Sequence, residues 1–419
     1  MNLINKKFNV DYIRSLFPIL DRKINGNNMV YFDNAATTQK PISVIDSIKD
    51  YYINYNSNIH RSVNSLSNIT TEYYEKTRIK VQNFINANSD KEIIFTKGTT
   101  DSINMFVQTY AADHLSKNDN IILSISEHHS NILPWQNLSK KVGFKINYIK
   151  CKLNGEFDFE DYKKNINYKT KIISISHVTN VTGHINSIKE IIDIAHHYGA
   201  TTFIDCAQSV NHILIDVQAL NCDFLAFSSH KMYGPMGVGI LYGKQKYLKL
   251  MRPYQFGGSM VVKVYTNKNS IYSDIPYIFE AGTPNVGNVI ALGYAIDFIN
   301  LIGINYIELY IKELHNYLYH KLSKINNINI IGNDNSQKSQ SGIISFSIKN
   351  LNSMDIGILL DTKGIIIRTG MMCAMPLVNF YKFSDLCRIS LAIYNTKNEI
   401  DICINNLDKI VKYLYDKQY

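Results

Sequence analysis

No segment of this 419-residue sequence approaches the roughly 18 consecutive apolar residues that a membrane-spanning helix needs. With 45% hydrophobic and 19% charged residues, the composition is that of an ordinary globular protein. The stretch from Met1 to Leu20 also lacks the continuous apolar run and the small-residue cleavage site of a secretory signal. We therefore expect a cytoplasmic protein that does not associate with a membrane.

Cysteine is scarce and irregularly spaced. The six cysteines form no CxxC pair and no short regular pattern, whereas a zinc site or a small disulfide framework would require one. We expect no bound metal ion, and a reducing compartment is the simplest environment for these thiols.

Runs of a single charge are missing as well. The formal net charge is +9, yet the lysines and arginines are scattered, without a basic cluster or an RNA-binding signature. Binding of small anionic molecules explains this charge as well as nucleic-acid binding does. We therefore expect no nucleic-acid partner.

Short β-branched runs alternate with helix-like stretches through most of the chain. One such stretch, Ile188 to His197, has the apolar spacing of an amphipathic helix. This alternation is typical of an α/β fold in which helices cover a mostly parallel sheet. The strands are expected at Met29 to Phe32, Glu92 to Phe95, Ile121 to Ile125, Ile172 to Ile175, Thr202 to Ile204, Phe224 to Phe227 and Gly239 to Leu241.

The pattern changes after Gly287. A long helical pattern runs from about Val289 through Leu322, and short strands are expected near Ile328 to Ile331 and Gly342 to Ile348. This order predicts a smaller α+β domain, although no linker or repeat marks its boundary. We predict a large domain over residues 22–300 and a small domain made of residues 1–21 and 301–419.

Polar residues follow several of the expected strands, where ligands gather in open α/β sheets. The segment Thr96 to Asp101 places hydroxyls and Gly98 at a strand-to-helix turn, which favours a phosphate, although for this segment taken alone a plain helix cap is the preferred explanation. His128 and His129 follow the next strand, and one of them could stack on a planar cofactor. Asn180 could hydrogen-bond a cofactor oxygen or simply occupy a turn.

Asp205 and Lys231 end the next two strands and form the most informative pair. A carboxylate at the end of a buried strand is costly unless it is paired, and a protonated pyridine nitrogen is a fitting partner. A lysine at the neighbouring strand end is positioned to form a Schiff base with an aldehyde. Taken singly, each has a structural explanation, but the ordered set of polar strand ends favours a pyridoxal-phosphate site.

These segments resemble the class V aminotransferase-like enzymes and, more narrowly, the Suf-type cysteine desulfurases. The resemblance covers nearly the whole chain and implies fold type I of the pyridoxal-phosphate-dependent transferases, with a large domain around a mostly parallel sheet and a smaller α+β domain. The matching segments are Tyr31 to Thr38, Gly98 to Thr100, Glu127 to Gln136, Ser228 to Pro235 and Phe279 to Asn285.

The resemblance implies a role for each matching position. Lys231 would carry the cofactor as a Schiff base, Asp205 would pair with its pyridine nitrogen, and His128 would stack on its ring and take part in catalysis. In family dimers the residue matching Thr283 reaches the phosphate of the opposite subunit, which implies a homodimer. The other implied cofactor contacts are Asn180 and Gln208 on the phenolic oxygen side and Thr100, Ser228 and His230 at the phosphate.

The segment Arg368 to Pro376 looks like the family loop whose cysteine attacks the substrate sulfur. Cys373 stands at the nucleophile position, in the predicted small domain. Without the resemblance, an inert structural cysteine would be the simpler interpretation. Family members usually carry two histidines before this cysteine, whereas Met371 and Met372 stand here, which puts the rate of the reaction in doubt.

Arg388 matches the arginine that binds the substrate carboxylate in the family, and a forked donor suits a carboxylate. Asn180 and Arg368 are further candidates for substrate contacts. A structural ion pair is the alternative role for either arginine.

The resemblance implies a cysteine desulfurase that converts L-cysteine to L-alanine and leaves a persulfide on Cys373. The sulfur would pass to a SufE-like acceptor or the Suf scaffold, for iron-sulfur cluster assembly. Selenocysteine lyase activity on L-selenocysteine is the nearest alternative. An ordinary aminotransferase fits less well, because it would have no use for the cysteine loop. A degenerate, non-catalytic subunit of a sulfur-transfer complex is the remaining possibility.

Overall fold

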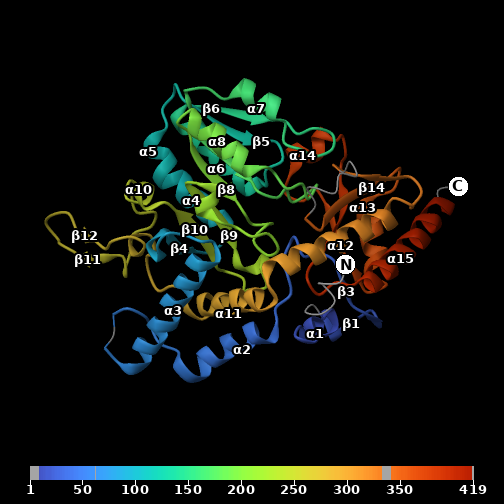
Figure 1. Ribbon diagram of the computed structural model, residues 1–419, viewed down its shortest axis with the longest axis horizontal. Coiled ribbons are helices and arrows are strands. Elements are labelled where there is room, and N and C mark those ends of the chain that lie inside the picture. The colour runs from blue at the N-terminus through green and yellow to red at the C-terminus, as the bar shows by residue number, and fades with distance from the viewer. Residues whose placement is uncertain (1–8, 62, 333–340, 418–419) are drawn as a thin grey trace.

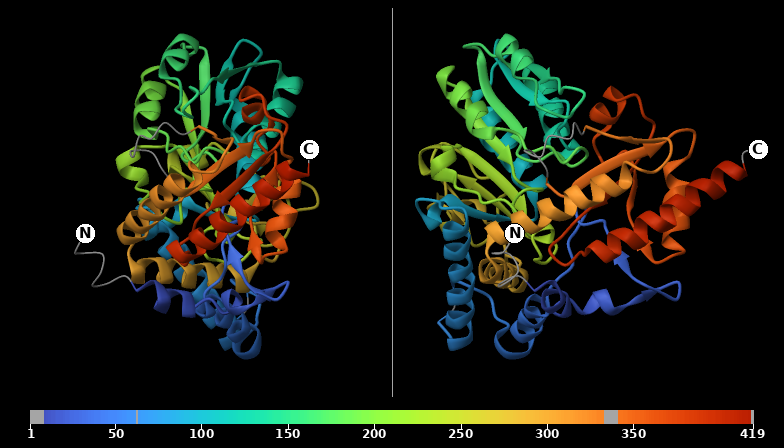
Figure 2. Two further views of the ribbon diagram at one scale, coloured as in Figure 1. Left: turned by 90° about the vertical axis from the view of Figure 1, so that its right-hand side faces the viewer. Right: turned by 45° about the vertical axis from the view of Figure 1, so that its right-hand side comes forward.

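The structure is a computed structural model that describes residues 9–61, 63–332 and 341–417. Its elements form a large α/β domain and a smaller α+β domain at one end, with the last helix, α15, on the outer side of the small domain (Figures 1 and 2). The hairpin of β11 (Val261–Lys263) and β12 (Ile271–Tyr272) projects from the opposite end (Figure 1). Residues 1–8 and 418–419 of the predicted small domain lie outside the described residues.

A seven-stranded sheet forms the centre of the large domain, in the order β4-β10-β9-β8-β7-β5-β6. Every neighbouring pair from β9 to β6 is parallel, and β10 is antiparallel to both of its neighbours. The predicted mostly parallel sheet is therefore confirmed. Its strands are β4 (Ile93–Thr96), β5 (Asn120–Ser124), β6 (Lys145–Ile149), β7 (Thr170–Ser176), β8 (Thr201–Asp205), β9 (Phe224–Ser228) and β10 (Gly239–Gly243).

Helices cover both faces of this sheet because its strands are apolar on both sides. Along β5, Ile121 and Leu123 pack in one buried cluster with helices α4 and α6, while Ile122 packs in another with α7 and α8. This follows from the two-residue period of a strand. The helices of the large domain are α2 (Ile42–Asp50), α3 (Ser65–Phe84), α4 (Thr99–Phe106), α5 (Ala112–His114), α6 (Leu133–Val142), α7 (Phe159–Asn165), α8 (Ile188–His197), α9 (Val217–Leu220), α10 (Gln245–Leu248) and α11 (Val286–Ile302).

The structure contains strands that the sequence did not predict, among them β6 in the large sheet and β16 and β17 in the small domain. The edge strand β6 was not expected, because Lys145 and Asn147 interrupt its apolar residues. The single helix expected through Leu322 is two helices, α11 and α12 (Ile304–Leu322), which bend by 76°. Gly303 lies between them at φ +92°, a conformation that ends a helix and that favours glycine. No single described helix is long and apolar enough to span a membrane, although α11 and α12 pass that test as a bent pair.

The small domain is built on a four-stranded antiparallel sheet in the order β13-β14-β17-β16. The apolar faces of α12 and α15 pack in the same buried cluster as this sheet. The other elements of this domain are β13 (Ile328–Ile330), β14 (Ile343–Ile348), α13 (Ser353–Asp361), β15 (Ile365–Ile366), β16 (Arg368–Gly370), α14 (Met375–Phe380), β17 (Leu386–Ser390) and α15 (Lys397–Asp416).

The amino-terminal segment contacts this small domain. In helix α1 (Val10–Ser15), Arg14 forms an ion pair with Glu399 at 2.8 Å. The segment continues through the short hairpin of β1 (Lys23–Ile24) and β2 (Asn27–Asn28) to β3 (Val30–Tyr31), which pairs in parallel with β15. The amino-terminal contribution to the small domain therefore extends past the predicted boundary at residue 21.

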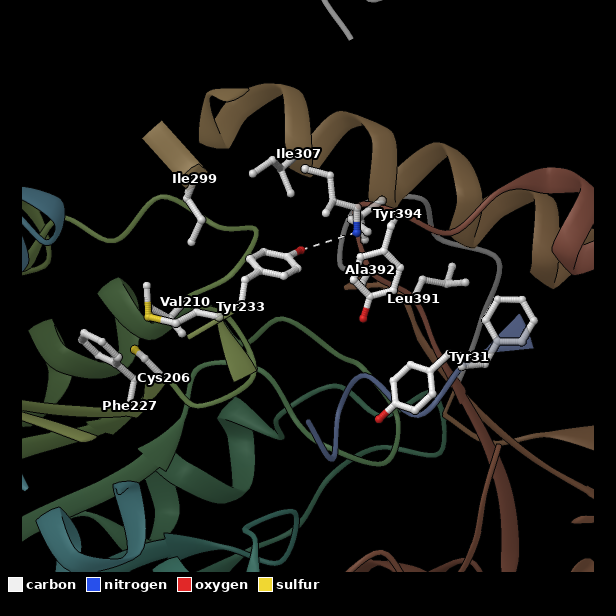
Figure 3. Close-up of a cluster of buried hydrophobic side chains, with 14 of the residues drawn as sticks. Tyr31, Cys206, Val210, Phe227, Tyr233, Ile299, Ile307, Leu391, Ala392 and Tyr394 are labelled. Atoms are coloured by element: carbon white, nitrogen blue, oxygen red, sulfur yellow. Dashed lines mark hydrogen bonds between the residues drawn. The ribbon is translucent and has the colours of Figure 1, made fainter. Parts of the chain in front are cut away.

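A continuous apolar seam joins the two domains. Figure 3 shows Tyr233, which lies between β9 and β10, among Tyr394, Ala392 and Leu391 of the small domain. The hydroxyl of Tyr233 accepts the backbone N–H of Ile393 at 3.4 Å. The seam belongs to one buried cluster that contains residues of both domains, so the domain boundary is a packed interface rather than a linker.

The contribution of a buried ion pair at the edge of the sheet to the stability of the protein can be tested. Arg78 in α3 is 1% exposed, and its Nη1 lies 2.7 Å from Oε1 of Glu280, which also accepts the N–H of Phe95 at 2.9 Å. We expect Glu280→Gln to lower the free energy of unfolding by about 2 kcal/mol, because it removes the buried carboxylate and leaves only Glu75, 2.8 Å from Nε and partly exposed, as counter-charge for Arg78. Urea denaturation at neutral pH measures this change.

The matched control is the exposed pair that Asp297 forms with Lys80, also on α3. Asp297→Asn should cost less than about 1 kcal/mol, because water already solvates both charges. Equal losses in the two variants would contradict a special role for the buried pair.

Candidate active site

A cavity of about 280 Å³ opens at the carboxyl ends of the central strands. Residues from the large domain line one side, and Arg388 of β17, Arg368 of β16 and Cys373 line the other. The cavity collects every predicted site residue except Thr283, which is exposed in the loop before α11. The predicted residues lining it are Thr100, His128, Asn180, Asp205, Gln208, Ser228, His230, Lys231, Arg368, Cys373 and Arg388.

Lys231 stands at the end of a single 3₁₀ turn, Ser229–Lys231, directly after β9. The carbonyl oxygen of His230 fixes this turn, because it accepts the N–H of Thr38 at 3.0 Å and the ammonium of Lys40 at 3.1 Å. Gly234 is required beside it, since a Cβ there would lie 2.1 Å from the Ser229 hydroxyl. The turn therefore presents Lys231 to the cavity from a rigid base.

Burial sets the charge of the central pair. It lowers the pKa of Lys231 to about 8, against the opposing effect of the nearby Asp205 carboxylate. Burial likewise raises the pKa of Asp205, whose Oδ1 accepts the N–H of Ala207 at 2.9 Å. Asp205 forms no ion pair within the described part of the chain, so its carboxylate is available to a cationic group in the cavity.

His128 lies between the turn after β5 and the cavity. Its Nδ1 accepts the N–H of Ser130 at 3.1 Å, so the proton of the neutral ring is assigned to Nε2. Burial, with Lys231 nearby, lowers its pKa to about 4. A neutral, flat ring is suited to lie against an aromatic cofactor.

The strand-to-helix turn at Gly98 forms a cradle of hydroxyls and amides. The Thr99 N–H donates to the Ser228 hydroxyl at 2.8 Å, and the hydroxyls of Thr100 and Ser130 lie 2.7 Å apart. Gly239 of the neighbouring strand β10 is required here, because a Cβ on it would lie 2.4 Å from the Cα of Gly98. The start of α4 adds its dipole, which favours a phosphate.

The two arginines share one carboxylate. Oδ1 of Asp33 accepts a hydrogen bond of 3.1 Å from Nη2 of Arg388, and Oδ2 of Asp33 lies 3.8 Å from Nη1 of Arg368. Burial raises the pKa of Asp33, and the two guanidinium groups work against that rise. Arg388 is buried, whereas half of the Arg368 side chain is exposed. Both arginines were predicted to bind the carboxylate of a substrate, and the protein's own Asp33 already offers a carboxylate to each of them.

The Cys373 loop reaches the cavity between β16 and α14. Cys373 is exposed, whereas the other five cysteines are buried, and all six thiols are free. The Met372 carbonyl oxygen accepts a hydrogen bond of 2.6 Å from Nδ2 of Asn180, which connects the loop to the turn after β7. The loop thus places one accessible thiol opposite Lys231.

Buried polar atoms without a partner fit a polar cofactor in this cavity. Three of them belong to lining residues: Nδ1 of His230, Oδ1 of Asn180 and Nε of Arg388. A buried polar group is costly unless it is hydrogen-bonded. Together with the amine of Lys231, the carboxylate of Asp205 and the hydroxyl cradle, these atoms match an aldehyde-bearing, protonated and phosphorylated pyridine.

Two residues near the cavity were not assigned a role from the sequence. Asp33 belongs to the segment after β3, which showed only that a strand ends there. His129 was one of two adjacent imidazoles, and the sequence could not distinguish their orientations. Both depend on contacts with the small domain, so only the folded chain identifies them.

Three comparisons place the chain among known proteins. Residues 30–403 match the family described as Aminotransferase class-V. The chain is 44% identical over 407 residues to a probable cysteine desulfurase of Halalkalibacterium halodurans, an alignment that covers 97% of this chain and 98% of that protein. It is also 44% identical over 403 residues to a cysteine desulfurase of Wigglesworthia glossinidia brevipalpis, with 96% and 97% covered.

A solved structure agrees with these likenesses. The crystal structure described as the cysteine desulfurase CsdA (S-sulfonic acid) from Escherichia coli superposes with a TM-score of 0.89 at 34% identity. The superposition covers 97% of this chain and 99% of that one. The likeness therefore extends over both domains.

Proposed function

The chain belongs to the class-V aminotransferase family. We propose that it is a pyridoxal-phosphate-dependent cysteine desulfurase that forms L-alanine from L-cysteine. Its fold is that of the fold type I enzymes. One observation carries the proposal: a single cavity joins Lys231 and Asp205 of the large domain to Cys373 and Arg388 of the small domain. An aminotransferase would need the lysine and the aspartate but not the exposed thiol.

The cofactor would be held by residues that already face the cavity. Bound pyridoxal phosphate withdraws electrons from the α-carbon of an attached amino acid, which makes the α-proton acidic. We propose that Lys231 binds it covalently, that Asp205 pairs with the ring nitrogen and that His128 lies against the ring. Thr100, Ser228 and His230 would bind the phosphate, and Asn180 and Gln208 the phenolic oxygen side.

Arg388 would bind the substrate carboxylate. Its Nε has no partner within the described residues, and a guanidinium binds a carboxylate with two parallel donors. Asn180 lies beside it, since its backbone oxygen accepts Nη1 of Arg388 at 3.0 Å. Arg368 adds positive charge from the other side of Asp33. The substrate would therefore enter with its carboxylate toward this group.

The Nζ atom of Lys231 would move protons at the substrate α-carbon. With its pKa lowered to about 8, an appreciable fraction of the amine is neutral near neutral pH and can accept a proton. Once protonated, the same amine can return the proton during product formation. The rigid 3₁₀ turn keeps this atom at the cavity.

Cys373 would take the sulfur. Its thiolate attacks the sulfur of the substrate, an S–S bond forms, and the C–S bond breaks with its electron pair on carbon. That carbon becomes the methyl group of alanine after protonation. The enzyme retains a persulfide on Cys373, and a thiol reductant or an acceptor protein must remove the outer sulfur before the next cycle.

The acceptor of the sulfur and the cellular compartment are further parts of the proposal. We propose that an acceptor of the SufE type or the Suf scaffold takes this sulfur for iron-sulfur cluster assembly, in the cytoplasm. The exposed position of Cys373 supports transfer of its sulfur to a second protein. L-selenocysteine differs from L-cysteine only in carrying selenium in place of sulfur, so selenocysteine lyase activity is a proposed second activity.

We also propose a homodimer. Thr283 is exposed and does not line the cavity of its own chain. A second hollow opens beside the hydroxyl cradle, lined by Lys97, Asn104 and Tyr254. A residue from a second copy entering this hollow would complete the phosphate site.

The test is product formation from L-cysteine by the purified, cofactor-loaded protein with a thiol reductant. We expect alanine and sulfide in equal amounts, with persulfide detectable on Cys373 by mass spectrometry when the reductant is omitted. 3-Mercaptopyruvate would indicate transamination instead, whereas pyruvate with ammonia would indicate β-elimination of sulfide. A loaded protein that forms no alanine from either L-cysteine or L-selenocysteine would favour the degenerate-subunit alternative.

A further inference from the structure

The loop that carries the nucleophile adopts an unfavourable backbone conformation. Met372 and Cys373 have φ angles of +54° and +52°, so two consecutive non-glycine residues are left-handed. Each such residue costs roughly 1 kcal/mol or more, because its Cβ approaches the carbonyl oxygen. Among the described residues, the only backbone hydrogen bond within this turn runs from the Ala374 N–H to the Met371 carbonyl, at 2.9 Å. Contacts from outside the loop must therefore stabilise it.

His129 supplies two of these contacts, one on each side of the nucleophile. Its backbone N–H donates to the carbonyl of Cys373 at 2.8 Å. Its ring Nε2 lies 3.0 Å from the backbone nitrogen of Met375 and accepts that N–H. In the neutral ring the proton must therefore be on Nδ1. One residue of the large domain thus brackets Cys373 and fixes the start of α14.

The apolar side of the loop explains why this bracket is needed. Met372 is 6% exposed and packs in a small buried cluster with Cys151, Val181 and Leu377. Its thioether fills space there but donates no hydrogen bond. The polar restraints on the loop therefore come from the large domain, through His129 and through the bond from Asn180 to the Met372 carbonyl.

We propose that His129 is a positioning residue whose imidazole holds the Cys373 loop over the cofactor cavity, and that release of this ring contact lets the loop carry sulfur outward. His129 does not line the cavity, so it acts only through the loop. The proposal deepens the function proposed above and rests on it for its catalytic consequence. The bracket itself is a property of the folded chain and can be tested without turnover.

The experiment compares His129→Leu with His129→Gln in the cofactor-loaded protein. Glutamine can place an acceptor oxygen near the position of Nε2, whereas leucine removes the acceptor and keeps similar bulk. Both keep the backbone bond to Cys373. We expect amide hydrogen exchange in peptides spanning residues 371–376 to quicken about five- to tenfold in the leucine variant, as for the loss of one hydrogen bond. The glutamine variant should stay within about threefold of wild type.

Further readouts separate a positioning role of His129 from general damage to the fold. Exchange in β9 should be the same in all three proteins, and His129→Phe serves as a second variant without an acceptor. Iodoacetamide should alkylate Cys373 about five- to tenfold faster in the leucine variant, while single-turnover persulfide formation slows and the KM for L-cysteine stays unchanged. Equal exchange in the leucine and glutamine variants would overturn the proposal. Faster exchange in the leucine variant of a protein without desulfurase activity would overturn the proposed function but leave the bracket intact.

Discussion

Serine in place of Cys373 is expected to reduce alanine formation from L-cysteine by about a thousandfold or more. A hydroxyl is a far weaker nucleophile than a thiolate at neutral pH, and no other described thiol is exposed at the cavity. The substitution changes one atom, so the loop and its contacts with His129 should persist. Steady-state alanine production and persulfide detection by mass spectrometry measure the loss.

The cofactor absorbance must be unchanged for this result to identify the nucleophile. Cys403→Ala is the matched control, because Cys403 is buried in α15 and should affect stability rather than turnover. If Cys373→Ser turned over at a rate near that of wild type, sulfur would have to leave the substrate without this thiol.

Methionine in place of Lys231 is expected to abolish both covalent cofactor attachment and turnover, the latter by about a thousandfold or more. Methionine fills similar space but has no amine to bind the aldehyde or accept the α-proton. Borohydride reduction followed by mass spectrometry should show an adduct on wild type and none on the variant. Asp205 and His128 should still retain some cofactor non-covalently.

Lys40→Met is the matched control for this test. Lys40 is also a partly buried lysine near the turn, and burial lowers its pKa to about 7. Its ammonium donates to backbone carbonyls and does not line the cavity. The adduct should therefore persist in Lys40→Met, and its disappearance there would assign the covalent bond to the wrong lysine.

The same variant has a pH signature in the cofactor-free protein. Folding lowers the pKa of Lys231 from 10.5 to about 8, so below pH 8 the folded state carries the full cost of burying the charge. Apo Lys231→Met should therefore gain stability relative to wild type at pH 7. The advantage should shrink by about 3 kcal/mol as pH rises from 8 to about 11, where the lysine is largely neutral in both the folded and the unfolded state. Urea denaturation at both pH values checks the sign, and an advantage that grows with pH would contradict it.

Much of the architecture was predictable because burial leaves a clear pattern in sequence. The helix from Ile188 to His197 ends where the prediction placed it, and the expected strand runs correspond to observed strands. The edge strand β6 was missed because Lys145 and the buried Asn147 interrupt its apolar residues. The break at Gly303 was missed because apolar residues continue on both sides of the glycine, and no helix-ending polar residue marks it.

The candidate site was predictable to the extent that it follows strand ends. Asp205 and Lys231 could be paired because parallel strands end at one edge of a sheet. The contacts across the domain boundary could not be predicted in this way. Asp33 contacts Arg388, and His129 contacts Met375, only when the small domain packs against the large one. The local pattern of residues along the sequence contains no information on these contacts.

The seam around Tyr233 limits how far the chain can be shortened. The turn that bears Lys231 continues directly into a tyrosine packed against Tyr394 and Phe298, with ring centroids 6.3 Å and 5.7 Å away. Removing the small domain would expose this ring and the apolar residues beneath the lysine turn to water. A truncated chain that ends after α11 should therefore aggregate rather than bind cofactor, so the protein has no minimal catalytic module to excise or to graft onto another scaffold.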